Sequence, residues 1–127
     1  MKTATVLIIE SQASVRMLLA GVLEDAGYQV CEAINGREGL EQIHVRPVDL
    51  VITDLEMPEM NGLEVILELT CAFLDVKVIT MSGRAAGELR KAKPLGGQQT
   101  FPTPLDLHAL LHAVQFELQH SPSNGVR

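Results

Sequence analysis

The sequence predicts a doubly wound α/β fold, a three-layer (βα)5 sandwich in which a five-stranded parallel sheet lies between two layers of helices. Short segments rich in β-branched residues alternate with longer segments of helical periodicity, a pattern typical of βαβ units. Three of the short segments are nearly continuous apolar runs, as strands buried on both faces should be. The length of 127 residues suits one domain with one core. The strands are predicted at residues 5–9, 28–33, 48–53, 76–81 and 99–101.

Helical patterns fill the intervals between these strands. Apolar side chains recur at three- and four-residue steps in three segments, at 15–26, 63–73 and 107–118. A shorter helix is expected at 36–44, and the segment 84–93 is the weakest helical pattern because it contains a glycine and is followed by a proline. The first of the three apolar stripes consists of Val15, Leu18, Leu19, Val22, Leu23 and Ala26.

Two residues are expected to mark helix boundaries. Asn35 stands where an N-cap would start the second helix, and Gly27 is expected to end the first helix. Helices that connect parallel strands form right-handed crossovers, so each helix must lie on one face of the sheet or the other. At this chain length the arrangement predicted is the flavodoxin-like strand order 2-1-3-4-5.

Composition excludes several classes of protein. The formal net charge of −6 disfavours non-specific binding to nucleic acid. No apolar run approaches the roughly 20 residues that a membrane span requires. The N-terminal segment is too short for a signal peptide, because its apolar run ends at Glu10, so a cytoplasmic location is expected. We expect one domain at residues 1–120, followed by a disordered polar tail at 121–127.

Polar side chains follow four of the predicted strands at the point where each strand ends. In a doubly wound sheet, ligands bind outside the carboxyl ends of the strands, where the strand order switches. These residues are therefore expected to converge on one crevice. No glycine-rich phosphate loop follows any of the strands, which argues against a nucleotide site. In strand order, the residues are Glu10 and Ser11, Asp54 and Glu56, Ser82, and finally Thr103 and Pro104.

Carboxylates and a hydroxyl group at such an edge predict Mg²⁺ and phosphate chemistry. The carboxylate of Asp54 is suited to act as a nucleophile toward phosphorus, which would form an acyl phosphate. The charge of that carboxylate repels an incoming phosphoryl group, so a divalent cation is needed to offset it. Mg²⁺ accepts one or two carboxylates as ligands and keeps water molecules in its remaining positions.

Four segments of the sequence resemble the receiver domain of two-component response regulators. They are VLIIES, DLVITDLEMPEMNGLEVI, VITMSG and TPLDLHALLHAV, and the resemblance spans nearly the whole chain. The second segment is the most specific, because it combines an aspartate, a Met-Pro pair and an Asn-Gly pair at the spacing typical of the family. The resemblance implies the flavodoxin-like fold and a role in signalling rather than metabolic catalysis.

The resemblance also implies roles for individual residues. Asp54 corresponds to the phospho-acceptor, and Glu10 to the first member of the family's acidic pair. Ser82 corresponds to the switch residue that contacts the phosphoryl group. Mg²⁺ ligands implied for this chain are Glu10, Asp54 and the backbone carbonyl of Glu56. Pro104 corresponds to a proline whose preceding peptide bond is usually cis in receivers.

Three positions depart from the family pattern. Ser11 replaces the second aspartate of the acidic pair, and Thr103 replaces a lysine that pairs with the phosphoryl group. Thr100 stands where the family has an aromatic switch residue. A neutral serine is a poor substitute for an anionic oxygen, so Mg²⁺ binding is expected to be weak. Loss of an acid and loss of a lysine offset one another in charge, so the pocket is not expected to be more strained than in its relatives.

The resulting hypothesis is a single-domain response regulator in a phosphorelay. It would accept a phosphoryl group on Asp54 from a histidine kinase or a phosphotransfer protein and pass the signal to a downstream protein target. Homodimerisation is left open. The alternative is a pseudo-receiver, a protein interaction module whose binding does not depend on phosphorylation. A phosphohydrolase that uses Asp54 as nucleophile and Glu56 as second acid ranks third, because no catalytic lysine motif accompanies them.

Two histidines on the last predicted helix have a spacing compatible with metal binding. His108 and His112 lie four residues apart, opposite the leucine stripe of that helix. A solvated helix face explains them more simply, and no glutamate of the HExxH type accompanies them.

Overall fold

A five-stranded parallel sheet forms the centre of the molecule, as the sequence predicts. The computed structural model describes residues 3–54, 67–68, 71, 76–82, 99–102 and 106–119. The strand order is β2-β1-β3-β4-β5, and every neighbouring pair is parallel. The predicted fold class and strand order are therefore confirmed. The strands are β1 (Thr5–Ile9), β2 (Gln29–Ala33), β3 (Leu50–Asp54), β4 (Lys77–Ser82) and β5 (Gln99–Pro102).

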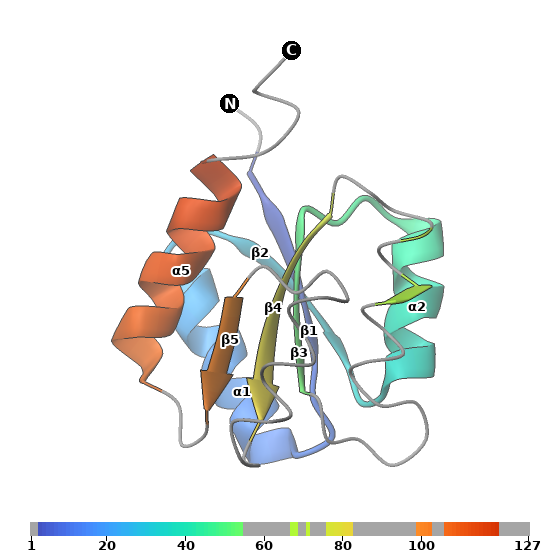
Figure 1. Ribbon diagram of the computed structural model, residues 1–127, viewed down its shortest axis with the longest axis horizontal. Helices are drawn as coiled ribbons and strands as arrows, with labels where there is room; N and C mark the ends of the chain where they lie inside the picture. The colour runs from blue at the N-terminus through green and yellow to red at the C-terminus, as the bar shows by residue number, and fades with distance from the viewer. Residues whose placement is uncertain are drawn as a thin grey trace.

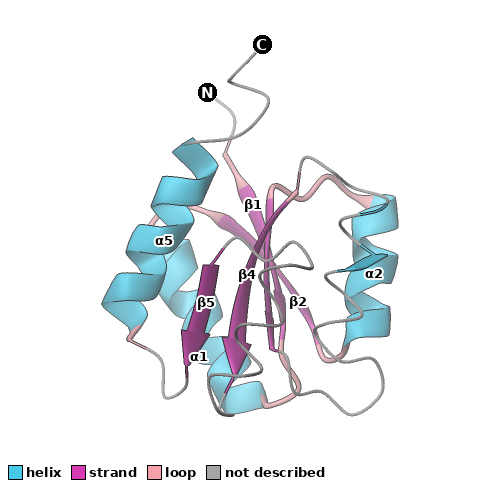
Figure 2. Cartoon of the chain, in the orientation of Figure 1, coloured by secondary structure: helices cyan, strands magenta, loops and turns pink. Residues whose placement is uncertain are grey.

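Helices cover both faces of this sheet. They are α1 (Ala13–Asp25), α2 (Gly36–Val45) and α5 (Leu107–Gln119). Figure 1 shows α1 and α5 on one face and α2 on the other, and the three layers are also clear in Figure 2. The main core lies between the sheet and the pair α1 and α5. Its fully buried members include Val6, Ile8, Leu19, Leu50, Ile52 and Val114.

The first helix ends as predicted but turns a slightly different face to the core. Gly27 has a φ of 99°, a left-handed conformation that favours glycine. The N–H of Tyr28 then donates to the carbonyl of Leu23 over 3.1 Å, which closes the last turn. The predicted apolar stripe was wrong at two positions. Leu18 is 55% exposed and Ala26 is also exposed, because the inward face is centred on the buried residues Leu19, Ala20 and Leu23.

The second helix begins at the predicted cap. The Asn35 side chain accepts a hydrogen bond from the N–H of Glu38 over 2.8 Å, and the Glu38 carboxylate accepts one from the N–H of Ile34 over 2.8 Å. The helix then packs closely on β1. A Cβ added at Gly39 would lie 2.7 Å from Cγ1 of the fully buried Ile9, so this contact requires glycine. The helix ends at Val45, one residue later than predicted.

The last helix buries an ion pair that the apolar pattern does not reveal. Leu110 and Val114 face the core as expected. Glu117 shares this face and is only 6% exposed, and its carboxylate lies 3.7 Å from Nζ of Lys77 at the start of β4. The pair ties the C-terminal part of α5 to the sheet.

Some sequence expectations fall outside the described residues. They are the helix at 84–93, most of the helix at 63–73, the domain boundary at 120 and the tail at 121–127. Among the helices that the structure describes, none is both long enough and apolar enough to cross a membrane.

Candidate functional site

The candidate site lies at the carboxyl ends of neighbouring strands. Strand β1 pairs with β3 with Ile9 opposite Thr53, so the next residue on each strand brings Glu10 and Asp54 to the same edge of the sheet. Parallel strands all end at the same edge, and this edge lies at the switch between β1 and β3 in the strand order. The two acids that the sequence singled out are therefore neighbours in the fold.

Glu10 is buried inside the turn that connects β1 with α1. It is only 4% exposed, and its backbone N–H donates to the carbonyl of Ala33 over 3.0 Å. The N–H of Gln12 donates to Oε2 of the Glu10 side chain over 2.9 Å. This hydrogen bond folds the carboxylate back over its own loop, so the side chain stays at the edge of the sheet instead of extending into solvent.

Arg16 fixes the same turn from the first part of α1. Its Nη1 donates to the backbone carbonyl of Glu10 over 2.8 Å, while its Nε lies 3.2 Å from Oε1 of Glu32 on β2. The guanidinium therefore joins the end of β1 to the edge strand. Sequence reasoning missed this role, because nothing in a helical pattern distinguishes an arginine that turns back toward the sheet from a solvated one.

Burial and a neighbouring carboxylate give Glu10 an unusual acidity. The pKa of Glu10 is raised to about 7, and burial is the largest cause. The negative charge of Asp54 and a hydrogen bond between the two side chains contribute to this rise, while the hydrogen bond from Gln12 and the charge of Arg16 oppose it. Near neutral pH, the Glu10 carboxyl is therefore protonated for part of the time.

Two buried threonines lie on the strands next to Asp54. Thr53 is fully buried, and its Oγ1 donates to the backbone carbonyl of Asp54 over 3.2 Å. Thr80 on β4 lies opposite Thr53 in the strand register and is also fully buried. Sequence reasoning assigned neither residue to the site. The alternation of side chains along a strand could have indicated that the residue before Asp54 faces the opposite side of the sheet.

A family model now identifies this arrangement. The model of the response regulator receiver domain matches residues 6–115, which includes both acids and all five strands except the first residue of β1. The chain belongs to this receiver family. Receiver domains are signalling modules of two-component systems, which accept phosphoryl groups and interact with histidine kinases or phosphotransfer proteins.

Individual relatives agree with the family match. The receiver is 32% identical over 118 residues to sporulation initiation phosphotransferase F of Bacillus subtilis, covering 91% of this chain and 94% of that protein. It is 36% identical over 120 residues to the sensor kinase CckA of Brucella abortus, covering 92% of this chain but only 13% of that protein. A receiver structure from Methanospirillum hungatei covers 98% of this chain and is itself covered completely, with a TM-score of 0.91 and 22% identity, and supports the fold.

The structure locates the other predicted site residues to different extents. Ser11 is exposed in the bend after Glu10, so its side chain does not share the buried position of the acid beside it. Ser82 is the last residue of β4, one position beyond the residue paired with Asp54. Thr100 lies on β5 in register with Thr80. The remaining three, Glu56, Thr103 and Pro104, lie outside the described residues, as does the predicted cis bond.

The pair of acids has the chemistry that Mg²⁺ requires. Carboxylate oxygens are its preferred protein ligands, and one or two carboxylates suffice. A buried carboxyl with a pKa of about 7 beside a second acid is a place where negative charge is poorly compensated, so a divalent cation fits there. In the part of the chain that the structure describes, no group of three or more His, Cys, Asp and Glu side chains could hold a metal ion.

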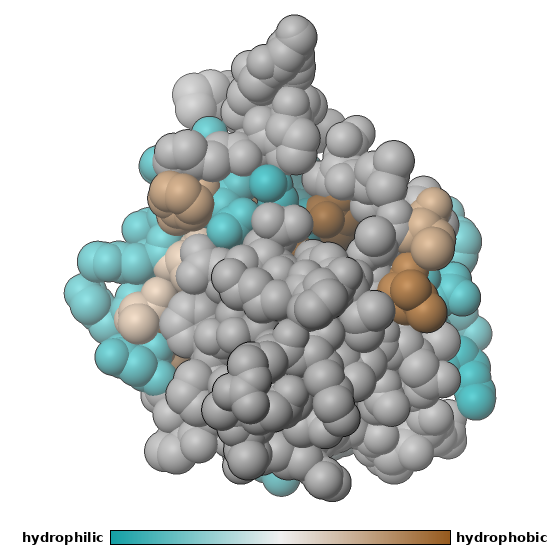
Figure 3. Space-filling view, viewed as in Figure 1, coloured by the Kyte–Doolittle hydropathy of each residue, from teal (hydrophilic) through white to brown (hydrophobic). Residues whose placement is uncertain are grey.

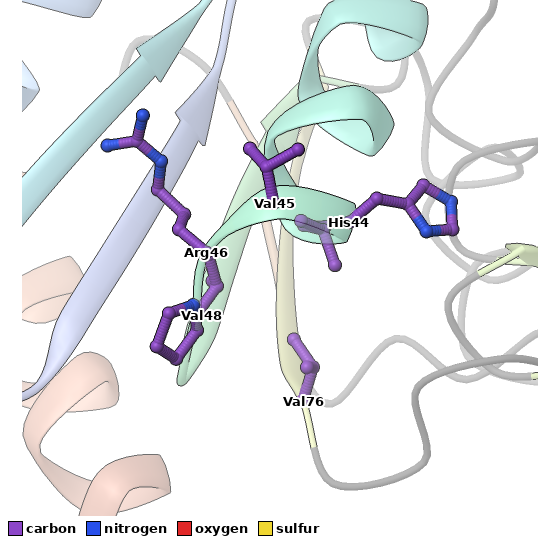
Figure 4. Close-up of a pocket in the computed structure, with 7 residues that line it drawn as sticks. His44, Val45, Arg46, Val48 and Val76 are labelled. Atoms are coloured by element: carbon purple, nitrogen blue, oxygen red, sulfur yellow. The ribbon is translucent and has the colours of Figure 1, made fainter.

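A surface hollow of about 430 Å³ lies elsewhere on the receiver. It is lined by residues from the end of α2 and from the segments just before β3 and β4, so it belongs to the opposite edge of the sheet. Figure 4 shows His44 and Arg46 pointing away from each other, with Val45 between them and Val48 and Val76 below. The described lining contains no acid, which separates this hollow from the acidic site.

Proposed function

We propose that this receiver accepts a phosphoryl group on Asp54 from a histidine kinase or a phosphotransfer protein. The observation that carries the proposal is the contact between buried Glu10 and Asp54 at the ends of neighbouring strands. An isolated aspartate at a strand end would be an ordinary turn residue. Here a second, buried acid lies beside it, and a loop hydrogen bond and an arginine fix the turn that carries this acid. Such a pair indicates a functional site and not only the end of a strand.

The chemistry proposed for Asp54 is a direct transfer. An oxygen of its carboxylate attacks the phosphorus of the phosphorylated donor, a new bond forms from oxygen to phosphorus, and the bond from phosphorus to the donor breaks. The product is an acyl phosphate on the protein and the free donor group. Thr53 positions the backbone of Asp54 through its hydrogen bond to the Asp54 carbonyl.

Glu10 and Asp54 would hold Mg²⁺, with the backbone carbonyl of Glu56 as a further ligand implied by the family. When bound, Mg²⁺ supplies the positive charge that allows an anionic phosphoryl group to approach two carboxylates. The neutral side chain of Ser11 is exposed and contributes no charge to this edge. We therefore propose weak Mg²⁺ binding and slow phosphorylation that requires a high Mg²⁺ concentration.

The switch is proposed to be degenerate as well. Ser82 retains the hydroxyl that would contact the phosphoryl group, but Thr100 and Thr103 stand where the family has an aromatic residue and a lysine. A phosphoryl group without the lysine loses a charge-assisted contact typically worth ~1.5–3 kcal/mol. Phosphorylation would therefore shift the two-state equilibrium of this receiver less than in a complete one.

The receiver is proposed to act as a regulator in a cytoplasmic phosphorelay, without metabolic catalysis of its own. This is supported by its similarity to sporulation initiation phosphotransferase F. Its downstream target is proposed to be a protein, since the net charge of −6 disfavours nucleic acid.

Phosphorylation can be tested by mass. The purified protein is incubated with a small acyl phosphate donor at several Mg²⁺ concentrations, and its intact mass is measured. One added phosphoryl group is expected, absent from Asp54→Asn and present in Asp25→Asn, a control that removes an exposed aspartate from the end of α1. An unmodified wild-type protein at the highest Mg²⁺ concentration, or equal modification of Asp54→Asn, would refute the proposal.

The second candidate is a pseudo-receiver that binds its partner without phosphorylation. The observation that favours it is that Ser11, a neutral and exposed residue beside Glu10, stands where the family has an acid. A partner captured by the wild-type protein with unchanged affinity for Asp54→Asn and without response to the phosphodonor would support this candidate over the first.

A further inference from the structure

The exposed face of α5 carries two imidazole side chains in contact with each other. His108 and His112 are both exposed, and their ring centroids lie 4.4 Å apart with an angle of 49° between the ring planes. Both project away from the core side of the helix, which is formed by Leu110, Ala113 and Val114. In Figure 3 the surface at the position of α5 is mixed, with hydrophilic and hydrophobic patches side by side. The solvated face expected from the sequence is confirmed, but the two rings are also close enough to act together.

The separation of the rings suits two ligands of one metal ion. With a metal–nitrogen bond of about 2.0–2.1 Å and a ring radius of about 1.1 Å, a coordinated imidazole has its centroid about 3.2 Å from the ion. Two such rings at a right angle would have centroids about 4.5 Å apart, whereas tetrahedral ligands would be about 5.2 Å apart. The observed 4.4 Å matches the right-angled arrangement. Right-angled nitrogen ligands are those of tetragonal Cu²⁺ and Ni²⁺ sites.

The helix end next to this pair is capped. Asp106 caps the helix, because its Oδ1 accepts a hydrogen bond from the N–H of Ala109 over 3.1 Å and its carbonyl accepts one from Leu110 over 2.9 Å. The capped turn is the one that carries His108. The described neighbours one turn away on the histidine face, Leu111, Gln115 and Phe116, are uncharged. The net charge of −6 attracts cations over a longer range.

We propose that His108 and His112 form a bidentate site for Cu²⁺ or Ni²⁺ on the exposed face of α5. The remaining coordination positions are open to water. Cu²⁺ and Ni²⁺ suit imidazole nitrogen, whereas Mg²⁺ suits carboxylate oxygen, so the histidine pair is not expected to compete with the acidic edge of the sheet for Mg²⁺. The inference does not depend on phosphorylation of Asp54, because the two sites share no residue.

A composition-matched variant gives the sharpest test. His112→Gln combined with Gln115→His keeps every residue type but moves the second imidazole to a spacing of seven, which is two turns from His108 and too far for chelation. Single variants His108→Gln and His112→Gln each remove one ligand. His44→Gln removes an exposed histidine on α2 and serves as the control.

Tag-free protein is titrated with Cu²⁺ and with Ni²⁺ by calorimetry, and copper spectra are recorded by electron paramagnetic resonance. Wild type and His44→Gln are expected to bind one equivalent with two coordinated imidazole nitrogens. The spacing variant and both single variants should bind about a hundredfold more weakly, because the second ligand is no longer held near the first. Equal binding by wild type and the spacing variant would overturn the proposal, as would a copper spectrum with one nitrogen ligand in wild type. Far-ultraviolet circular dichroism checks that each variant keeps its helices.

Discussion

Replacing Glu10 by glutamine should stabilise the receiver at alkaline pH and leave its stability at acidic pH nearly unchanged. The Glu10 carboxyl is only 4% exposed and lies beside Asp54. In the unfolded chain it would titrate near its ordinary value of 4.5, whereas burial raises its pKa to about 7 in the folded protein. Between these two values the folded protein binds more protons than the unfolded chain. Stability from this group therefore falls as the pH rises from about 4.5 to about 7.

The size of this fall follows from the two pKa values. Their difference of about 2.5 corresponds to about 3 kcal/mol in the free energy of unfolding. This is an upper value, because Asp54 takes part in the same titration. Glutamine keeps an oxygen that can accept the hydrogen bond from the N–H of Gln12 and removes the charge that burial disfavours. The variant should therefore gain as much as about 3 kcal/mol over wild type at pH 8 and almost nothing at pH 4.

Urea denaturation at a series of pH values measures this difference directly. Glu41→Gln, which neutralises an exposed acid on α2, should follow the wild-type pH dependence. Mg²⁺ supplies a second comparison, because a ligand of the folded state adds RT ln(1 + [L]/Kd) to stability. Mg²⁺ should stabilise wild type at pH 8 and stabilise Glu10→Gln much less. A Glu10→Gln protein that is no more stable than wild type at pH 8 would show that the reasoning about the buried pair is wrong.

Three further substitutions test the supports of the fold and the site. Lys77→Met should lower the free energy of unfolding by about 3 kcal/mol, because it removes the counter-charge of the buried Glu117 carboxylate, and adding Glu117→Leu should restore most of the loss in urea denaturation. Arg16→Gln should cost about 1.5–3 kcal/mol through the lost hydrogen bond to a backbone carbonyl, and should raise the pKa of Glu10 further, which carboxyl titration by NMR would detect. Asn35→Ala should cost about 1 kcal/mol in thermal or urea denaturation by removing the cap of α2, while Asn35→Asp should keep most of it.

The fold was predictable because several local signals agree with one another. Continuous apolar runs identify buried parallel strands, and the segments between them have helical period, so few topologies remain. The roles of Asn35 and Gly27 were predictable because each position needs a property that few residue types have. The first has a side chain that accepts a hydrogen bond from a free N–H group, and the second adopts a φ of 99° that few other residues tolerate.

The errors and omissions arise where a side chain's role depends on distant parts of the chain. Leu18 belongs to the apolar stripe by spacing, but the rotation of α1 against the sheet leaves it 55% exposed. Glu117 looks like a surface acid on a helix, yet Lys77, forty residues earlier, pairs with it inside the protein. Periodicity assigns residues to a face of a helix. It does not determine which part of that face packs against the sheet or which charges find partners there.

The candidate site could also be predicted from the sequence only in part. That Glu10 and Asp54 follow neighbouring strands could be derived from the strand order alone. The environment of Glu10 could not, because it depends on the N–H of Gln12, the guanidinium of Arg16 and the closeness of the Asp54 carboxyl. These contacts decide whether the acid is ionised, and they form only after β1, β3 and α1 have packed together.

The neutral side chain of Ser11 and the raised pKa of Glu10 both affect how strongly the site would bind a cation. Ser11 is neutral and exposed, so the described edge carries a smaller negative charge than an edge with three acids would. The charge that remains is concentrated on a buried carboxyl and its neighbour, where it is least well solvated. The missing third acid would weaken cation binding at this edge. Relief of the repulsion between Glu10 and Asp54 would strengthen it. Binding of Mg²⁺ and stability of the fold should therefore be linked through Glu10, and measuring one as a function of pH reports on the other.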